Sequence, residues 1–204
     1  MNLWSRWVQR LASKEEGLSL ALIRIGVGLV VAGDLLNTWW DGAIPLIWAS
    51  STQNPLGFRK PPEGWLFHAL GGATLPHVQL LCILTFLCAL LLSLGLASRW
   101  MALLTLQGFL ALFDLNAMAG GGHDRVLSNA LWILVFSQSD QTLSLSSKWR
   151  TGKWLDPTPV FAWPRWILFA QMTLLYTDTG WQKLGAEWFF WGDLRAVHNM
   201  LLSP

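Results

Sequence analysis

Residues 78–96 read VQLLCILTFLCALLLSLGL, and this stretch decides the class of fold. It is nearly free of polar groups, and its length suits a helix that crosses the hydrocarbon core of a bilayer, which takes about 20 residues. It is the least ambiguous apolar run in the chain. The stretch therefore predicts a membrane-spanning helix.

Four further apolar runs flank this stretch. The turn at 97–99 leads straight into the run that starts at Trp100, and the run after Arg125 is short enough to be a buried or re-entrant segment instead. The last run begins at Trp163, whose neighbour Pro164 suits the first turn of a helix. The sequence predicts an all-α, integral membrane helical bundle, a single domain over residues 1–204, with about five transmembrane helices near 18–36, 78–96, 100–118, 125–138 and 163–184.

The composition agrees with this class. Hydrophobic residues make up 53% of the chain and charged residues only 13%, against roughly 25% charged in an ordinary soluble domain. The 15 Trp residues suit the headgroup level of a bilayer. The net charge of +2 is too small to indicate nucleic acid as a partner. Cys82 and Cys88 lie six apart in an apolar helix and form neither a disulfide nor a zinc site by spacing.

The segments outside the predicted spans are of two kinds. Residues 1–17 are amphipathic, with Trp and Leu alternating with Arg and Lys, and they suit a helix lying on the membrane surface. Residues 37–77 contain many turn residues, but the apolar patches 44–49 and 64–70 predict that this loop packs on the membrane face rather than floating free.

The distribution of Lys and Arg predicts the orientation in the cell membrane. With five spans, most of the positive charge falls on one side, which is then cytoplasmic and holds the amino terminus: the amino-terminal segment, Arg99, Lys148, Arg150, Lys153 and Arg165. The opposite face receives Asp34, Asp41, the 114–124 loop and the 178–187 cluster. Three distant segments thus bring ionisable residues to one membrane face, which predicts a polar site there.

Lys183 is the leading candidate for chemistry at this face. Partial desolvation among Trp181, Trp188 and nearby Phe residues would favour the neutral amine, the form that acts as a general base. The alternative is that Lys183 marks the helix end and extends to the lipid headgroups. Glu187, four residues on, is also placed to pair with it, which would favour the charged form.

His123 is a second candidate acid or base, with an ordinary interfacial loop histidine as the alternative. The glycines before it do not form a phosphate-binding loop, and the four His residues show no metal-ligand spacing. Asp34 and Asp178 also have a structural alternative, which is pairing with Arg24, Arg125 or Gln182 inside the bundle.

A family resemblance rests on the end of the last run. Tyr176, Gly180, Lys183, Leu184, Trp188 and Gly192 resemble the signature Tyr-x-x-x-Gly-x-x-Lys-Leu-x-x-x-Trp followed by Gly of the horizontally transferred transmembrane (HTTM) domain family. That family contains the membrane part of the vitamin K-dependent gamma-carboxylases. Residues 24–34 with Asp41-Gly42, and residues 121–124 with the apolar run after them, resemble two further stretches of the family.

The resemblance implies an enzyme that acts on a reduced quinone. Lys183 would deprotonate a vitamin K-like quinol with help from His123, and we expect Asp34, Asp41, Tyr176 and Trp188 to bind this lipid-soluble cosubstrate, without a metal. The carboxylases continue beyond the point that matches Pro204, so we expect a short or truncated family member and do not expect peptide carboxylation. The alternative is a non-catalytic module that anchors a redox or other membrane protein, and a transporter fits the pattern poorly.

Overall fold

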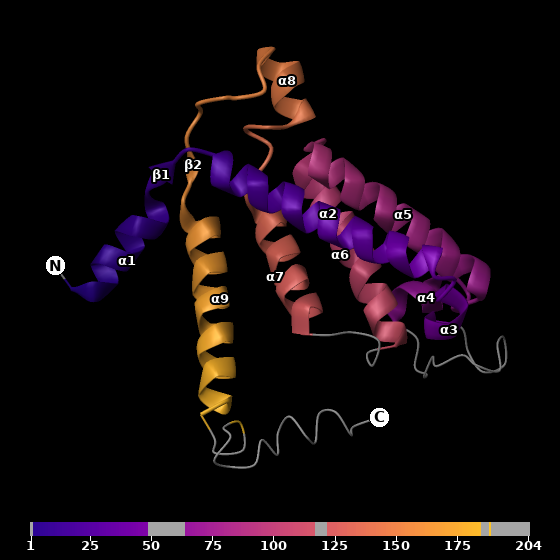
Figure 1. Ribbon diagram of the computed structural model, residues 1–204. Helices are drawn as coiled ribbons and strands as arrows, with labels where there is room; N and C mark the ends of the chain where they lie inside the picture. The colour runs from indigo at the N-terminus through magenta and orange to yellow at the C-terminus, as the bar shows by residue number, and fades with distance from the viewer. Residues whose placement is uncertain (1, 49–63, 117–121, 185–187, 189–204) are drawn as a thin grey trace. The chain divides into compact units, whose positions relative to one another are not determined.

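The computed structural model describes residues 2–48, 64–116, 122–184 and 188. The chain divides into two units, Met1–Pro164 and Arg165–Pro204. Nearly all regular structure in the described residues is helical, which confirms the all-α prediction (Figure 1). The elements in chain order are α1 (Leu3–Ala12), β1 (Lys14–Glu15), α2 (Leu18–Trp40), α3 (Ile44–Trp48), α4 (Trp65–Ala69), α5 (Leu75–Leu94), α6 (Ser98–Leu115), α7 (Gly122–Phe136), α8 (Leu145–Thr151), β2 (Val160–Phe161) and α9 (Trp163–Gln182).

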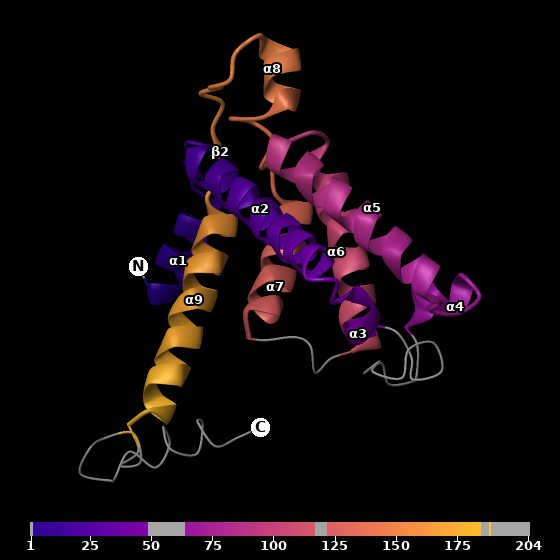
Figure 2. The same cartoon turned by 45° about the vertical axis from the view of Figure 1, so that its right-hand side comes forward.

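Four helices form the core of the first unit. Helix α2 packs on α5, α5 on α6 and α6 on α7, and α7 also contacts α2 (Figure 2). Leu92, Leu106 and Leu131, from α5, α6 and α7, are fully buried at their centre. The turn between α5 and α6 is short because Gly95 and Ala97 both adopt left-handed conformations, with φ of 73° and 45°. Such a short connection makes α5 and α6 antiparallel neighbours.

Small residues bring the core helices close together. A Cβ at Gly28 of α2 would collide with Ser93 and would lie 2.6 Å from the carbonyl oxygen of Ala89, both on α5. A Cβ at Gly108 of α6 would collide with Thr85 of α5. Membrane helices commonly associate through such small residues, since lipid gives little hydrophobic drive to helix contact.

Helices α2 and α5 are long and apolar enough to cross a membrane, and no other helix among the described residues meets the same test. Less than half of each apolar window is buried within the protein. The outward faces are apolar: Leu22 and Leu29 of α2 and Leu80 and Leu84 of α5 are each about half exposed. Side chains of this kind suit contact with lipid. Helices also occupy the other three predicted ranges, but the five-span topology and the single domain over residues 1–204 stay predictions.

The loop between α2 and α5 packs against the bundle where the sequence shows apolar patches. Patch 44–49 contains α3, and patch 64–70 contains α4. Helix α3 contacts α5 and α4 contacts α6, with Trp48 and Phe67 buried in the core. The intervening residues of the predicted loop lie outside the described residues.

The amino-terminal segment is tied to a distant part of the unit by two short strands. After α1, whose Trp4 and Trp7 are exposed, β1 pairs antiparallel with β2, with Lys14 opposite Phe161. The amide of Ala162 adds a hydrogen bond of 2.9 Å to the carbonyl oxygen of Ser13. The predicted interfacial segment therefore ends in a strand, and its location on a membrane surface stays a prediction.

Arg24 is buried at the end of the bundle where α2 begins, and it is fully inaccessible. Its guanidinium donates hydrogen bonds to the carbonyl oxygens of Ser139 at 2.5 Å and Leu143 at 2.6 Å, both in the segment after α7. The sequence left open that Asp34 pairs with Arg24, and this alternative is wrong. The two residues are ten apart on one helix, which separates them by about 15 Å along its axis.

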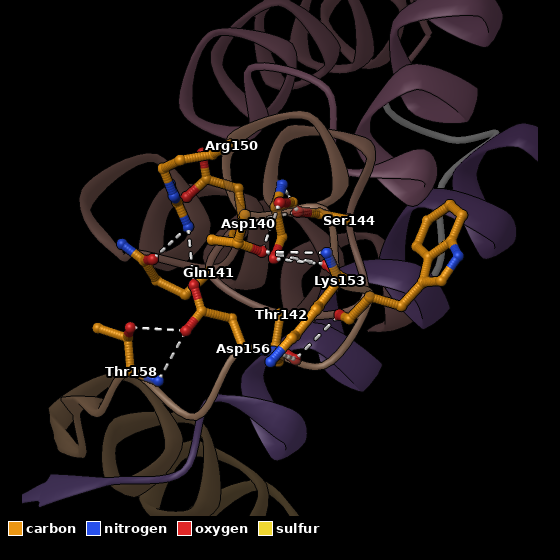
Figure 3. A network of polar contacts seen from close by, with 11 residues as sticks. Asp140, Gln141, Thr142, Ser144, Arg150, Lys153, Asp156 and Thr158 are labelled. Atoms are coloured by element: carbon orange, nitrogen blue, oxygen red, sulfur yellow. Dashed lines mark hydrogen bonds and ion pairs between the residues drawn. The ribbon is translucent and has the colours of Figure 1, made fainter.

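A polar cap follows α7 at the same end of the unit, and Figure 3 shows its contacts. We use the name polar cap for residues 137–158. Arg150 of α8 donates to Gln141 at 2.6 Å and lies 3.4 Å from Asp156. Thr158 donates to Asp156 through its hydroxyl and its amide, and these bonds, with Arg150, hold the pKa of Asp156 below its usual range. The cap contacts the end of α5 and the start of α6, because the amide of Ser146 donates to the carbonyl oxygen of Gly95 and the hydroxyl of Ser146 accepts from the amide of Ala97.

The second unit consists, in its described part, of most of α9 and the residues just after it. Pro164 occupies the first turn of α9, where its missing amide hydrogen costs nothing. Phe169, Leu174, Tyr176 and Trp181 are exposed along the helix. This apolar surface is that expected of a helix in contact with lipid or with another protein.

Candidate functional site

A cavity of about 240 Å³ lies in the first unit, where α2 and α6 end and α7 begins. Four helices and the residue after α6 supply its walls. The residues are Asp34, Leu35, Asn37 and Thr38 of α2, Ile47 and Trp48 of α3, Phe109, Leu112 and Phe113 of α6, Asn116, and His123 and Asp124 of α7. The cavity therefore combines acidic, imidazole and aromatic groups from parts of the chain that are far apart in sequence.

The first turn of α7 supplies a histidine and a carboxylate side by side. His123 Nε2 lies 3.3 Å from Asp124 Oδ1, and the side chain of His123 is 67% exposed while that of Asp124 is 12% exposed. The carboxylate sits in the first turn of the helix, where the helix dipole stabilises negative charge. The imidazole at the cavity mouth is thus held by a buried carboxylate.

This pair can move a proton. When Nε2 carries a hydrogen and donates it to Asp124, the other ring nitrogen, Nδ1, is left as the acceptor. A carboxylate on the donor nitrogen stabilises the imidazolium that forms when Nδ1 takes up a proton. Asp34 faces the same space from α2, and as a carboxylate it can accept a hydrogen bond from a ligand hydroxyl.

Hydrogen bonds to main-chain oxygens hold the aromatic wall in place. Trp48 Nε1 donates to the carbonyl oxygen of Leu112 at 3.0 Å, and Asn116 Nδ2 donates to that of Ile47 at 2.9 Å. Each bond joins α3 to the end of α6. Together they fix the short helix α3 as one side of the cavity.

On the α2 side, polar residues are arranged by local hydrogen bonds. Thr38 Oγ1 donates to the carbonyl oxygen of Asp34 at 2.8 Å. Asn37 Nδ2 donates to Asp41 Oδ2 at 3.1 Å. Asp41 is not among the lining residues, so its link to the cavity runs through Asn37, which does line it.

The structure brings only part of the predicted set together. Asp34 and His123 line one cavity. The sequence had predicted that their two segments, which are far apart in the chain, meet at one face. Tyr176, Lys183 and Trp188 belong to the second unit, which is considered by itself. The catalytic and substrate-binding roles assigned to all these residues stay predictions.

Lys183 has one of its predicted aromatic neighbours. Its Nζ lies 5.3 Å from the centroid of the Trp188 ring, and the lysine is exposed. A ring at this distance attracts an ammonium ion to its face. Trp181 is 75% exposed. The predicted partner Glu187 and the signature residue Gly192 lie outside the described residues.

Several lining residues were not singled out from the sequence. Trp48 and Asn116 carry the hydrogen bonds that shape the cavity, and Phe109 and Phe113 supply its ring surface. The apolar patch 44–49 pointed to packing near Trp48 but gave no reason to connect it with His123. The acceptors of both bonds are main-chain oxygens, which leave no pattern in a sequence.

The two long apolar helices, their exposed apolar faces and the polar cavity at one end of the bundle are typical of a helical membrane protein. The chain belongs to the HTTM domain family, because the model of that family matches residues 13–201. This membership relates it to the membrane part of the vitamin K-dependent gamma-carboxylases. No curated protein and no solved structure matches the chain.

Proposed function

We propose that this HTTM protein binds the head group of a reduced quinone, or of a related lipid-soluble phenol, in the cavity between α2 and α7, and removes a proton from it. The observation that carries the proposal is the meeting of Asp34 with the His123–Asp124 pair beside an aromatic wall. A quinol offers two hydroxyl donors and a flat ring, and these suit the carboxylate acceptors and the aromatic lining residues Trp48 and Phe113.

The size of the cavity favours a ring-sized ligand. Its volume of about 240 Å³ is below the roughly 300–1,000 Å³ of pockets for drug-sized molecules. A folded peptide segment or a whole lipid requires more space. One aromatic head group bound through its hydroxyls is the ligand that these dimensions and side chains suit.

In the proposed reaction, Nδ1 of His123 accepts the proton of one quinol hydroxyl and leaves the quinol monoanion. Asp124 stabilises the resulting imidazolium through Nε2. Asp34 accepts a hydrogen bond from the second hydroxyl and so orients the ring. Lys183 remains a second candidate base on the strength of the family signature, and it is tested separately from His123.

The test uses the full chain in lipid nanodiscs with a reduced naphthoquinone that lacks a tail. Dissolved oxygen oxidises a quinol through its ionised form, so the rate of quinol loss reports proton removal. His123→Gln should slow this rate by about 100-fold, the lower range for loss of a general base, with folded yield unchanged. His68→Gln is the matched control, because His68 is exposed and lies outside the lining set.

Two further variants separate the roles. Asp34→Asn should weaken quinol binding and affect the rate at saturation less, because Asp34 orients the ligand. Lys183→Ala should abolish turnover if the lysine is the base and leave it unchanged if the lysine only contacts Trp188. Absence of quinol binding to the unmodified protein would contradict the proposal, and a complex with another membrane protein that survives mild detergent would then favour the anchoring module.

A further inference from the structure

A hollow of about 240 Å³ lies at the end of the bundle that carries the polar cap. We call it the Arg99 hollow. Its walls come from three parts of the first unit: the first turn of α6, the end of α7 with the start of the polar cap, and the residues around β2. They include Arg99, Phe136, Ser137, Gln138, Phe161 and Trp163.

Arg99 supplies the positive charge of this hollow. Its Nε donates to the carbonyl oxygen of Ser137 at 3.1 Å, and within the described residues this is the only hydrogen bond of its side chain. A guanidinium carries five N–H donors in one plane, so those on its two terminal nitrogens remain for a ligand. No carboxylate is among the described residues that line the hollow. The hollow therefore suits an anion, and the planar guanidinium matches the oxygens of a phosphate.

A second cation lies beside the hollow, on strand β1. Lys14 is paired with Phe161 across the two strands, and its Nζ lies 5.7 Å from the centroid of the Phe161 ring. Successive side chains of a strand point to opposite faces. Glu15 therefore lies on the other face, opposite Val160. The ring of Phe161 is thus shared by the hollow and by the lysine.

The surface near the hollow is apolar. Trp100 and Phe136 are 67% and 66% exposed, and Leu94, the last residue of the apolar helix α5, is 53% exposed. Only the turn at 95–97 and Ser98 separate α5 from Arg99. Trp and Arg at the end of a spanning helix are typical of the headgroup level of a bilayer. A ligand at this place meets both a phosphate-binding group and exposed apolar side chains.

We propose that the Arg99 hollow binds the phosphate of an anionic phospholipid, whose acyl chains lie against the exposed apolar side chains near it. Arg99 holds the phosphate oxygens, and Lys14 adds a second positive charge at Phe161. The site is separate from the cavity between α2 and α7, and the inference does not rest on the proposed function.

The charges favour an anionic lipid over a zwitterionic one. The trimethylammonium group of phosphatidylcholine is repelled by Arg99 and Lys14, whereas phosphatidylglycerol carries only the negative charge of its phosphate. Anionic lipids attract basic segments at the cytoplasmic leaflet, and basic pockets between membrane helices on this side bind such headgroups. The distribution of Lys and Arg predicts that the polar cap lies on the same side.

The experiment counts bound lipids by native mass spectrometry of the full chain in mild detergent. Phosphatidylglycerol is titrated against phosphatidylcholine, and the unmodified protein should retain the former in preference. Arg99→Gln should weaken phosphatidylglycerol binding on the order of tenfold, as expected for loss of a hydrogen-bonded charge. Arg6→Gln is the matched control, because Arg6 is exposed and lies outside the hollow lining. Equal weakening in both variants, or no preference for phosphatidylglycerol, would overturn the proposal.

A second variant keeps the test decisive if Arg99→Gln fails to fold. Gln138→Glu leaves the bond between Arg99 and Ser137 in place and adds a carboxylate with little change in volume. It should also weaken phosphatidylglycerol binding on the order of tenfold, through repulsion of the phosphate and competition for the guanidinium. Gln9→Glu makes the same change on the exposed surface of α1 and should leave binding unchanged. Unaltered binding in Gln138→Glu would contradict a phosphate in the hollow.

A further measurement separates a lipid from a free anion. Inorganic phosphate is added at the concentration of phosphatidylglycerol, and it should not displace the lipid, because it makes no contact with the apolar side chains. Displacement at equal concentration would overturn the lipid as the occupant.

Discussion

At the scale of single residues, the end of the bundle near Arg24 depends on a glycine. Gly95 ends α5 with a φ of 73°, and a Cβ there would lie 2.7 Å from Arg24 Nη1 and collide with Ser144. The glycine thus serves two needs, since it permits the left-handed turn and leaves room for the guanidinium. Ser144 belongs to the polar cap, and Arg24 bonds to carbonyl oxygens of the cap, so the turn and the cap are coupled.

We expect Gly95→Ala to destabilise the protein more than Gly152→Ala. Gly152 ends α8 with nearly the same φ, 74°, but within the part of the chain that the structure describes a Cβ there has no neighbour closer than 4 Å. Alanine at 152 should cost only the left-handed strain of about 1–2 kcal/mol, and alanine at 95 should cost about 1–3 kcal/mol more from overpacking. Denaturant titration in detergent measures both variants, and equal losses would show that Arg24 and Ser144 move aside freely.

At the scale of elements, the packing of α2 on α5 depends on which glycines of α2 face the neighbour. Gly28 faces α5 so closely that a Cβ would lie 2.6 Å from a carbonyl oxygen, whereas a Cβ at Gly26 or Gly33 meets no atom of the described residues within 4 Å. Gly28 therefore sets how closely α2 approaches α5. Gly26 and Gly33 only lower the helical propensity of α2.

Alanine should have opposite effects on stability at the glycine that contacts α5 and at a glycine of α2 that does not. Gly26→Ala should leave stability unchanged or raise it by about 0.5–1 kcal/mol through helix propensity. Gly28→Ala should lower it by about 1–3 kcal/mol because it forces α2 and α5 apart. Thermal unfolding in nanodiscs measures the difference, and a stabilised Gly28→Ala protein would mean that the helices do not pack as described.

At the scale of the whole molecule, the first unit has two chemically different ends. One end carries Arg24 and the polar cap with Lys148 and Arg150, and the other carries the cavity with Asp34 and His123. Helix α5, about 30 Å long for its 20 residues, separates them. If α5 crosses the bilayer, the cap and the cavity face opposite compartments.

Cysteine labelling tests this arrangement. In a background without Cys82 and Cys88, Thr151→Cys in α8 and Ala69→Cys in α4 place exposed thiols at the two ends. A membrane-impermeant maleimide should reach Ala69→Cys in intact cells and Thr151→Cys only after lysis, since the side rich in Lys and Arg is expected in the cytoplasm. Labelling of both positions in intact cells would contradict a spanning α5.

The sequence predicted the helices well and the contacts between them poorly. The lengths of the apolar runs predicted five helices, and the structure has a helix in each of these ranges. The alternation of the predicted spans also put Asp34 and His123 on the same side, and both line one cavity at one end of the bundle. The partners of Arg24 could not be predicted, because they are carbonyl oxygens that any residue provides. The β1–β2 pair could not be predicted either, since strands of two residues show no periodicity.

The pairing of β1 with β2 also constrains the order of assembly during synthesis. Lys14 and Glu15 emerge from the ribosome early, but their partners Val160 and Phe161 follow only after α2, α5, α6 and α7 have been made. Strand β1 therefore has no β2 partner while the core helices are being made. This strand pair can close only after the four core helices have been made, and a nascent chain stopped before Val160 holds every core helix but cannot form the β1–β2 pair.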